Sequence, residues 1–116
     1  MFLLFVLSAI PPEKHCDALK RLRRILKRGG KLLFRDYADG DLAQERFSSN
    51  SKVSEHLFVR QDGTLSFFFT EERLQSIALD AGFQVVATKL IKRTIRNRKL
   101  KKAMHREWLQ AELLAI

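Results

Sequence analysis

The sequence predicts an α/β domain that has a mostly parallel sheet, an antiparallel last strand and an inserted β-hairpin. Three patterns in its 116 residues support this prediction. Two apolar runs, 1–10 and 31–37, flank an amphipathic helical stretch; an Asp-Gly pair at 62–63 separates two β-forming runs; and two later apolar runs are joined by a short basic link. A chain of this length suits one small domain that buries roughly two thirds of its unfolded surface.

The first apolar run, "MFLLFVLSAI", is interpreted as a strand. A signal peptide would have a positive residue before its apolar run, and none precedes this one. The run is also too short to span a bilayer. Its nearly continuous apolar character is typical of a central parallel strand that is covered on both faces.

Pro11 and Pro12 end this strand and open a helix, because proline is favoured in a first helical turn. Gly29-Gly30 stops the helix, and "KLLFRDY" at 31–37 forms the next strand. The unit is therefore strand–helix–strand with a right-handed crossover. The apolar face of the helix is Ala18, Leu19, Leu22, Ile25 and Leu26.

An insertion and a hairpin occupy about 38–69. Residues 38–57 are polar and are interpreted as an insertion loop with a short helix around 42–47. Asp62-Gly63 predicts a type I′ turn between two strands. Strand alternation places Phe67 and Phe69 on one face and Phe68 on the other, and one of these faces should pack on the sheet.

The last third of the chain predicts a helix and two strands. Thr70 caps the helix, Glu71 and Glu72 lie in its first turn, and Gly82 ends it. Its buried face is Leu74, Ile77, Ala78 and Ala81. "FQVVATKLIKRTI" and "AMHREWLQAELLA" follow as strands, and because the basic link "RNRKLKK" between them is short, they should be antiparallel.

Composition points to a polyanionic partner. The formal net charge is +9, and 46% of the residues are hydrophobic, as in a globular protein. Nucleic acid or an anionic membrane surface is the first partner to consider, and a basic surface without a partner is the alternative. Cys16 is the only cysteine, which excludes a disulfide framework and favours a reducing compartment. His15, His56 and His105 lack metal-ligand spacing, so no metal site is expected.

Four local strings carry a more specific signal: "FVLSAIPPEKH", "LKRGGKLLFRDYADGD", "VRQDGTLSFFFTEE" and "DAGFQVV". In this order they resemble the methyltransferase-like family of S-adenosylmethionine-dependent tRNA N(3)-methylcytidine methyltransferases, which modify the anticodon loop. The resemblance runs over essentially the whole chain and is weakest at 84–103 and at the C-terminus. It implies the C-terminal half of a class I (Rossmann-like) methyltransferase fold.

The resemblance also sets expectations for what surrounds this chain. Family members carry a Gly-rich S-adenosylmethionine loop and a ribose-binding acid, and neither occurs here, so residues 1–116 are expected to be a partial methyltransferase domain without its donor-binding half. The implied cofactor is S-adenosylmethionine and the implied partner is tRNA. An aminoacyl-tRNA synthetase or another accessory protein is a further partner of the full-length family. No membrane association is implied, and the expected location is the cytoplasm or the nucleus.

The predicted site lies at the carboxyl ends of the strands, where ligands bind in open α/β sheets. By resemblance, Leu4, Phe5, Leu7 and Ser8 line the donor pocket; the alternative is that these apolar residues are core. Methylation of cytosine N3 leaves positive charge on the ring, which a carboxylate can stabilise. Asp36 is the first candidate for this role and Asp62 the second. Arg35 is expected to grip a phosphate or the cytosine O2; the alternative is a strand-end ion pair between Arg35 and Asp36.

RNA contacts are predicted from aromatic and basic residues. Tyr37, or a phenylalanine of the hairpin, is expected to stack on a flipped base, and the hairpin tip presents Arg60 and Gln61 to the target nucleotide. Residues 89–106 contain nine Lys and Arg and no acid, and with the basic helix at 20–28 they are expected to track phosphates. A solvated charge run is the alternative. The residues expected to contact RNA here are Arg98, Lys99, Lys101, Lys102, His105 and Arg106.

Two other functions remain open at the level of sequence. The first is a non-catalytic RNA-binding remnant, which the basic surface and the missing donor loop favour. The second is a methyltransferase of the same fold that acts on a protein or a small molecule. The segment of nine basic residues without an acid argues against the second.

Overall fold

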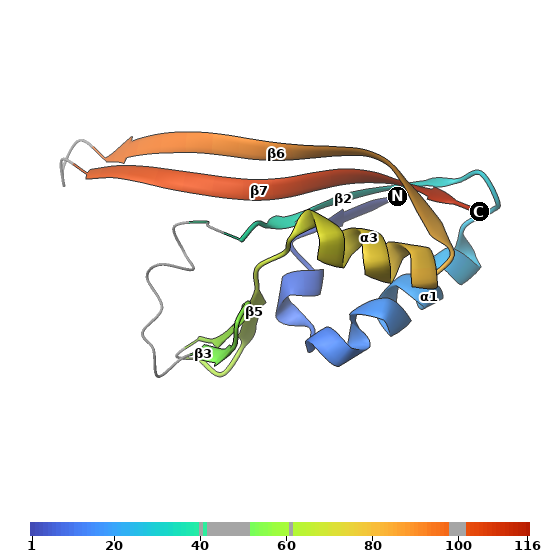
Figure 1. Ribbon diagram of the computed structural model, residues 1–116, viewed down its shortest axis with the longest axis horizontal. Helices are drawn as coiled ribbons and strands as arrows, with labels where there is room; N and C mark the ends of the chain where they lie inside the picture. Colours follow the sequence, from blue (N-terminus) through green and yellow to red (C-terminus); the bar gives the residue numbers. More distant parts are fainter. Residues whose placement is uncertain (40, 42–51, 61, 98–101) are drawn as a thin grey trace.

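A four-stranded sheet with helices on one face forms the body of the molecule, as the computed structural model shows (Figure 1). The structure describes residues 1–116 except 40, 42–51, 61 and 98–101. The strand order is β1-β2-β7-β6, and a second sheet has the order β3-β4-β5. The helices α1 and α3 lie beneath the first sheet in Figure 1 and leave its other face open.

The first unit is β1 (Phe2–Leu4), α1 (His15–Ile25) and β2 (Lys31–Tyr37). β1 is parallel to β2, with Phe2 opposite Leu33 and Leu4 opposite Arg35, which confirms the predicted strand–helix–strand unit. Two short 3₁₀ turns, η1 (Leu7–Ala9) and η2 (Pro12–Lys14), join β1 to α1.

β1 does not have the predicted burial on both faces. Only three residues form the strand, and the side chains of Phe2 and Leu4 are 72% and 45% exposed. Within the described chain β1 is an edge strand that pairs with β2 alone, and no helix covers the face to which Phe2 and Leu4 belong. An apolar run can indicate a strand, but it does not by itself reveal what will cover it.

The core lies between the sheet and the two helices. In β2, burial alternates along the strand, so that Leu32, Phe34 and Asp36 face the helices. Leu109, Ala111 and Leu113 of β7 are buried on the same face. From α1, Leu19 joins this core as predicted, whereas Ile25 is 70% exposed and does not. The prediction for Ile25 is therefore wrong, because the helix ends there and its last turn lies at the surface.

The second helix, α3 (Glu71–Asp80), forms as predicted. The Thr70 hydroxyl accepts a hydrogen bond from the Arg73 backbone N–H at 3.2 Å, which is the N-cap geometry. Gly82 has a φ of 93° after the helix, a conformation that glycine adopts readily. The predicted face is buried: Leu74, Ile77, Ala78 and Ala81.

The last two strands, β6 (Phe83–Asn97) and β7 (Lys102–Ala115), are antiparallel, as predicted. β7 also pairs with β2 in antiparallel fashion, so the strand that comes last in the sequence lies inside the sheet. The sheet is therefore mixed, and within it β1 and β2 form the parallel pair among the described strands. Figure 1 shows the paired ends of β6 and β7 extending beyond the helices, and we call residues 89–97 and 102–108 the ribbon. Beyond the pairing of Tyr37 with Trp108, the ribbon has only two strands in the described chain.

The inserted hairpin consists of β4 (Leu57–Val59) and β5 (Leu65–Phe67). A third strand, β3 (Lys52–Ser54), pairs with β4, and no sequence pattern predicted it. The expected helix around 42–47 lies outside the described residues. The turn differs from type I′. The Gly63 N–H donates to the Arg60 carbonyl, Arg60 N–H donates to the Thr64 carbonyl, and Gly63, but not Asp62, has a positive φ. This is the pattern of a longer loop closed by a glycine bulge.

Both faces of the phenylalanine run are buried. Phe67 and Phe69 lie against His15, with ring centroids 5.0 and 5.2 Å away, while Phe68 lies against Tyr37 at 5.9 Å. The alternation predicted from the sequence is thus present, and each face has its own partner. A bridge between Ala38 and Phe69 connects the hairpin segment to the end of β2.

Candidate functional site

The carboxyl ends of β1 and β2 meet at one edge of the sheet, and Asp36 joins them. Its Oδ2 accepts a hydrogen bond from the Ser8 backbone N–H at 3.0 Å, and its Oδ1 accepts one from the Tyr37 N–H at 2.8 Å. The side chain is fully buried. Asp36 therefore fixes the η1 turn, which carries Leu7 and Ser8, against the end of β2.

Burial raises the pKa of the Asp36 carboxyl, because removing the carboxylate from water disfavours its charged form. Hydrogen bonds from Ser8 and Tyr37 oppose this shift. The Asp36 carboxylate makes no solvent contact among the described residues, so any effect on a ligand would be indirect.

The alternative of an Arg35–Asp36 ion pair is wrong. Adjacent residues of a strand point to opposite faces, and Arg35 belongs to the open face of the sheet. There the Arg35 Nε donates to the Gln110 side-chain oxygen at 3.0 Å, and Nη2 donates to the same oxygen. The predicted phosphate or O2 contact of Arg35 stays a prediction.

Four rings gather at the end of β2, around Tyr37 and Phe5: Phe5, Tyr37, Phe68 and Trp108, called here the aromatic cluster. The Phe5 ring centroid lies 5.2 Å from that of Tyr37 and 6.0 Å from that of Trp108. Phe5 has a φ of 55°, which is uncommon for a residue with a side chain. The cluster places apolar surface where β1 leaves the sheet.

The residues predicted to line the donor pocket divide into two groups. Leu4 and Phe5 are 45% and 38% exposed, whereas Leu7 and Ser8 are buried. Leu7 packs in the core, so for this residue the core alternative describes its contacts. The exposed pair lies at the carboxyl end of β1, the position that ligands use in related sheets.

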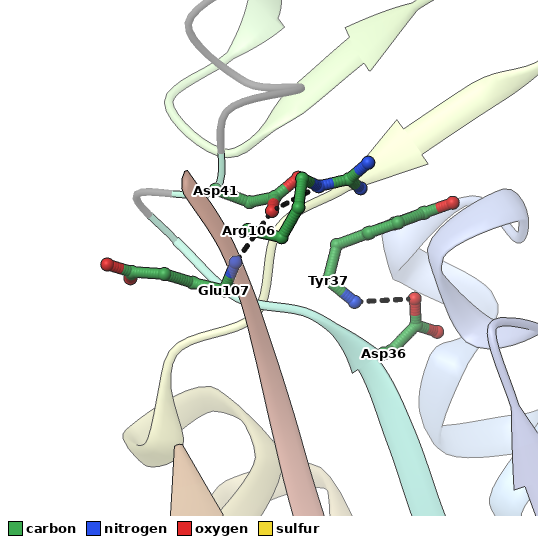
Figure 2. A network of polar contacts seen from close by, with 5 residues as sticks. All are labelled: Asp36, Tyr37, Asp41, Arg106 and Glu107. Atoms are coloured by element: carbon green, nitrogen blue, oxygen red, sulfur yellow. Dashed lines mark hydrogen bonds and ion pairs between the residues drawn. The ribbon is translucent and has the colours of Figure 1, made fainter. Parts of the chain in front are cut away.

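A second carboxylate, which the sequence analysis did not single out, lies just beyond β2 (Figure 2). Asp41 is fully buried, and its Oδ1 accepts hydrogen bonds from Arg106 Nε at 2.9 Å and from the Glu107 N–H at 2.7 Å. The Arg106 guanidinium carbon lies 5.8 Å from the centroid of the Tyr37 ring. Asp41 stands in a polar stretch without periodicity, so no sequence pattern indicated its burial.

Polar side chains of the hairpin tip form hydrogen bonds within the hairpin. Asp62 Oδ1 accepts hydrogen bonds from the Thr64 N–H at 3.0 Å and from the Thr64 hydroxyl at 2.6 Å, and these bonds lower the pKa of the Asp62 carboxyl. Arg60 Nε donates to the Ser66 hydroxyl at 2.8 Å. Asp62 thus shapes the turn, and Gln61 lies outside the described residues.

Positive charge follows the ribbon. Lys89, Lys92, Arg93 and Arg96 are exposed on β6, and Arg93 stands directly opposite Arg106 of β7. Like charges in directly opposed positions are unfavourable in a sheet on its own. The backbones of Lys102 and His105 lie in β7, their side chains lie outside the described part, and Arg98, Lys99 and Lys101 fall in an undescribed segment.

Other types of site find no support in the described residues. No three His, Cys, Asp or Glu side chains of that part gather as they would to hold a metal ion. Its helices also include none that is long and apolar enough to cross a membrane.

Comparison with known proteins gives the sequence family. No family model matches. The chain is 49% identical over 110 residues to tRNA N(3)-methylcytidine methyltransferase trm141 of Schizosaccharomyces pombe, in a match that covers 92% of this chain and 44% of that protein. It is 42% identical over 112 residues to tRNA N(3)-cytidine methyltransferase METTL2 of Bos taurus, over 97% of this chain and 30% of that protein. The chain is homologous to part of these tRNA N(3)-cytidine methyltransferases.

The chain spans less than half the length of these relatives, and the same holds for METTL6 of Homo sapiens, which is 40% identical over 114 residues and is covered to 40%. Solved structures agree on the fold. S-adenosylmethionine-dependent methyltransferases from Methanosarcina mazei and Anabaena variabilis align with TM-scores of 0.72 and 0.70, at 16% and 15% identity, over 99% of this chain. The chain therefore forms part of a Rossmann-like α/β fold of the methyltransferase type.

Proposed function

We propose that the chain is the part of an S-adenosylmethionine-dependent tRNA methyltransferase that places tRNA for methylation of cytidine N3. The observation that carries the proposal is identity of 40–49% to named tRNA N(3)-cytidine methyltransferases over almost the whole chain. The convergence of Asp36, the aromatic cluster and Arg106 at one edge of the sheet supports it.

Each group has a proposed role. The buried Asp36 carboxylate stabilises the positive charge that appears on the methylated ring, since charges act strongly where water is excluded. It also positions η1. The aromatic cluster offers a stacking surface for an unpaired base, as enzymes that act on bases require. The ribbon contacts phosphates, and the opposed Arg93 and Arg106 favour an anionic partner.

The chain fits the donor only in part. S-adenosylmethionine would supply the methyl group, and the exposed Leu4 and Phe5 suit an apolar side of such a ligand. The sequence contains no Gly-x-Gly loop that would cradle it, because its only adjacent glycines, 29 and 30, follow a helix. We therefore expect the donor to need residues that the relatives carry outside the matched segment. An aminoacyl-tRNA synthetase or another accessory protein is proposed as a further partner, in the cytoplasm or the nucleus.

A chimera tests the function. Residues 1–116 would replace the matching segment of the Schizosaccharomyces pombe relative, and 3-methylcytidine would be measured by mass spectrometry in tRNA incubated with the purified chimera and donor. We expect the chimera to form 3-methylcytidine at a level within about tenfold of that given by the intact relative. A tenfold difference in rate corresponds to about 1.4 kcal/mol in the activation barrier. A chimera that folds and binds tRNA without methylating it would favour a second function, RNA binding alone.

A further inference from the structure

The segment after β2 is tied to β7 by the buried Asp41 carboxylate. One oxygen, Oδ1, accepts both the Arg106 Nε–H and the Glu107 backbone N–H, at 2.9 and 2.7 Å. Backbone bonds hold the segment from the other side: the Ala38 N–H donates to the Glu107 carbonyl at 3.1 Å, and the Asp41 N–H donates to the Ala38 carbonyl at 3.0 Å. The position of Asp41 relative to Arg106 is therefore fixed at several points.

This contact orients the Arg106 side chain. Figure 2 shows the guanidinium reaching past Asp41, with its two terminal nitrogens on the side away from the carboxylate. Nε is engaged by Asp41, and within the described part of the chain the terminal nitrogens donate no hydrogen bond. The side chain is 26% exposed, and its terminal nitrogens are not among the buried unpartnered atoms of the described chain, so they can be reached from outside while Asp41 holds Nε.

Such an arrangement suits a phosphate. A guanidinium presents two parallel N–H groups that match two oxygens of a phosphate, and the match requires a defined orientation of the plane. Arg93, directly opposite on β6, adds positive charge beside Arg106. The Tyr37 ring, 5.8 Å from the guanidinium carbon, connects this position to the aromatic cluster.

We propose that Asp41 is a positioning residue, which holds Arg106 so that its terminal nitrogens bind a backbone phosphate of the RNA next to the aromatic cluster. The inference rests on the proposed function, because it takes RNA as the ligand. Asp41 lies outside the basic segment and carries a negative charge, yet this proposal gives it an indirect role in RNA binding.

The sign of one substitution tests the idea. Asp41→Asn removes a negative charge from a basic surface, and long-range electrostatics alone would then strengthen RNA binding. Loss of positioning weakens it instead. Asn keeps a carbonyl oxygen for the Glu107 N–H but gives up the charge-assisted bond to Arg106. We expect the affinity of the 116-residue chain for a labelled anticodon stem-loop RNA to fall about tenfold. The slope of log affinity against log salt should decrease by about 0.7 to 0.9, which corresponds to one phosphate.

Two control variants make the result specific. Asp39→Asn removes the same charge from an exposed carboxylate two residues earlier, one that pairs with His56 Nδ1 at 3.2 Å, and it should leave affinity unchanged or slightly higher. Arg106→Gln should weaken binding by itself, and adding Asp41→Asn to it should cause no further decrease. Thermal unfolding of every variant establishes that folded proteins are compared.

Each outcome decides something. Equal binding by Asp41→Asn and Asp39→Asn would overturn the positioning role, as would a decrease in affinity that is the same with and without Arg106. If Asp41→Asn does not fold, Arg106→Lys replaces it: Lys keeps the charge but has no planar pair of donors, and wild-type affinity in that variant would also overturn the inference. No RNA binding by the wild-type chain would instead overturn the proposed function itself.

Discussion

Asp36 shows how one buried carboxylate can carry both structure and chemistry. Each of its oxygens accepts a backbone N–H, one from Ser8 and one from Tyr37. An asparagine at this position must place its NH₂ group against one of these donors. The substitution that removes the charge therefore also leaves a buried N–H unsatisfied, and its effects on folding and on rate have to be measured separately.

We predict that Asp36→Asn lowers the free energy of unfolding by about 1–3 kcal/mol, the usual cost of one unsatisfied buried donor. Urea unfolding of the 116-residue chain measures this. In the chimera, below its melting temperature, the same variant should lower the single-turnover methylation rate by roughly a hundredfold with little change in tRNA affinity, as expected for charge stabilisation in the transition state. Arg60→Ala should show the opposite pattern, weakening tRNA binding more than it lowers the single-turnover methylation rate. A normal rate in folded Asp36→Asn would leave the carboxylate with a structural role alone.

His15 gives a prediction about pH. The ring is buried; Arg73 Nη2 lies 3.4 Å from Nδ1, and since Arg only donates, Nε2–H must be the donor to the Ile10 carbonyl at 2.8 Å. Burial lowers the pKa of His15 below its usual 6.5. The unfolded chain therefore binds more protons than the folded one below pH 6.5, so stability from neutral His15 is complete above that pH and is lost as the pH falls toward the folded pKa.

Thermal unfolding at about pH 7.5 and about pH 5.5, on either side of the ordinary histidine pKa, measures this effect. The melting temperature of the wild type should fall on acidification by more than that of His15→Gln, whose amide can still donate to Ile10. The contribution of Asp36 to the pH dependence is the same in both proteins and cancels in this comparison. Its raised pKa acts in the opposite direction, because the stabilising effect is present below pH 3.8 and is lost as the pH rises through the folded pKa of Asp36. His56→Gln, at a partly exposed histidine, should behave as the wild type. An equal pH effect in wild type and His15→Gln would contradict the prediction.

At the scale of elements, local patterns carried most of the fold. The helix α3 was predictable from its cap and its apolar spacing, and β2 from its apolar run and the preceding glycines. The burial of β1 was not predictable, because cover depends on elements packed from elsewhere. β3 was missed because its three exposed residues, Lys52–Ser54, have no apolar pattern. For the site, strand ends predicted the meeting of Asp36 and Ser8, whereas Asp41 is held by residues of β7 that are distant in the sequence.

The ribbon permits a test of the charge hypothesis. Reversing Lys92, Arg93 and Arg96 to Glu should reduce the salt slope of RNA binding by roughly 0.7 to 0.9 for each phosphate that the ribbon no longer neutralises. A second variant reverses Lys20, Arg24 and Lys27, which are exposed in or just beyond α1, and tests separately the basic helix that is also expected to track phosphates. Filter binding at several salt concentrations measures both slopes. An unchanged slope in the ribbon variant would make the ribbon a solvated surface.

At the scale of the whole chain, we expect the donor site to be incomplete, and this too is testable. We expect no measurable binding of S-adenosylmethionine by the 116-residue chain in calorimetric titration, because Leu4 and Phe5 offer apolar contact without a loop to hold the polar groups of the ligand. The chimera should bind it. A micromolar dissociation constant for the chain alone would show that the exposed end of β1 suffices.

The strand order β1-β2-β7-β6 bears on the time at which this protein can fold as it is synthesised. The helices and β2 emerge from the ribosome before β7, yet β2 and β6 do not pair with each other and are joined only through it. Until β7 is available, β2 presents an unpaired edge, and non-local pairing of this kind is slow and open to aggregation. A nascent chain that pauses between residues 98 and 101 would therefore depend on chaperones until β7 is available to pair with β2.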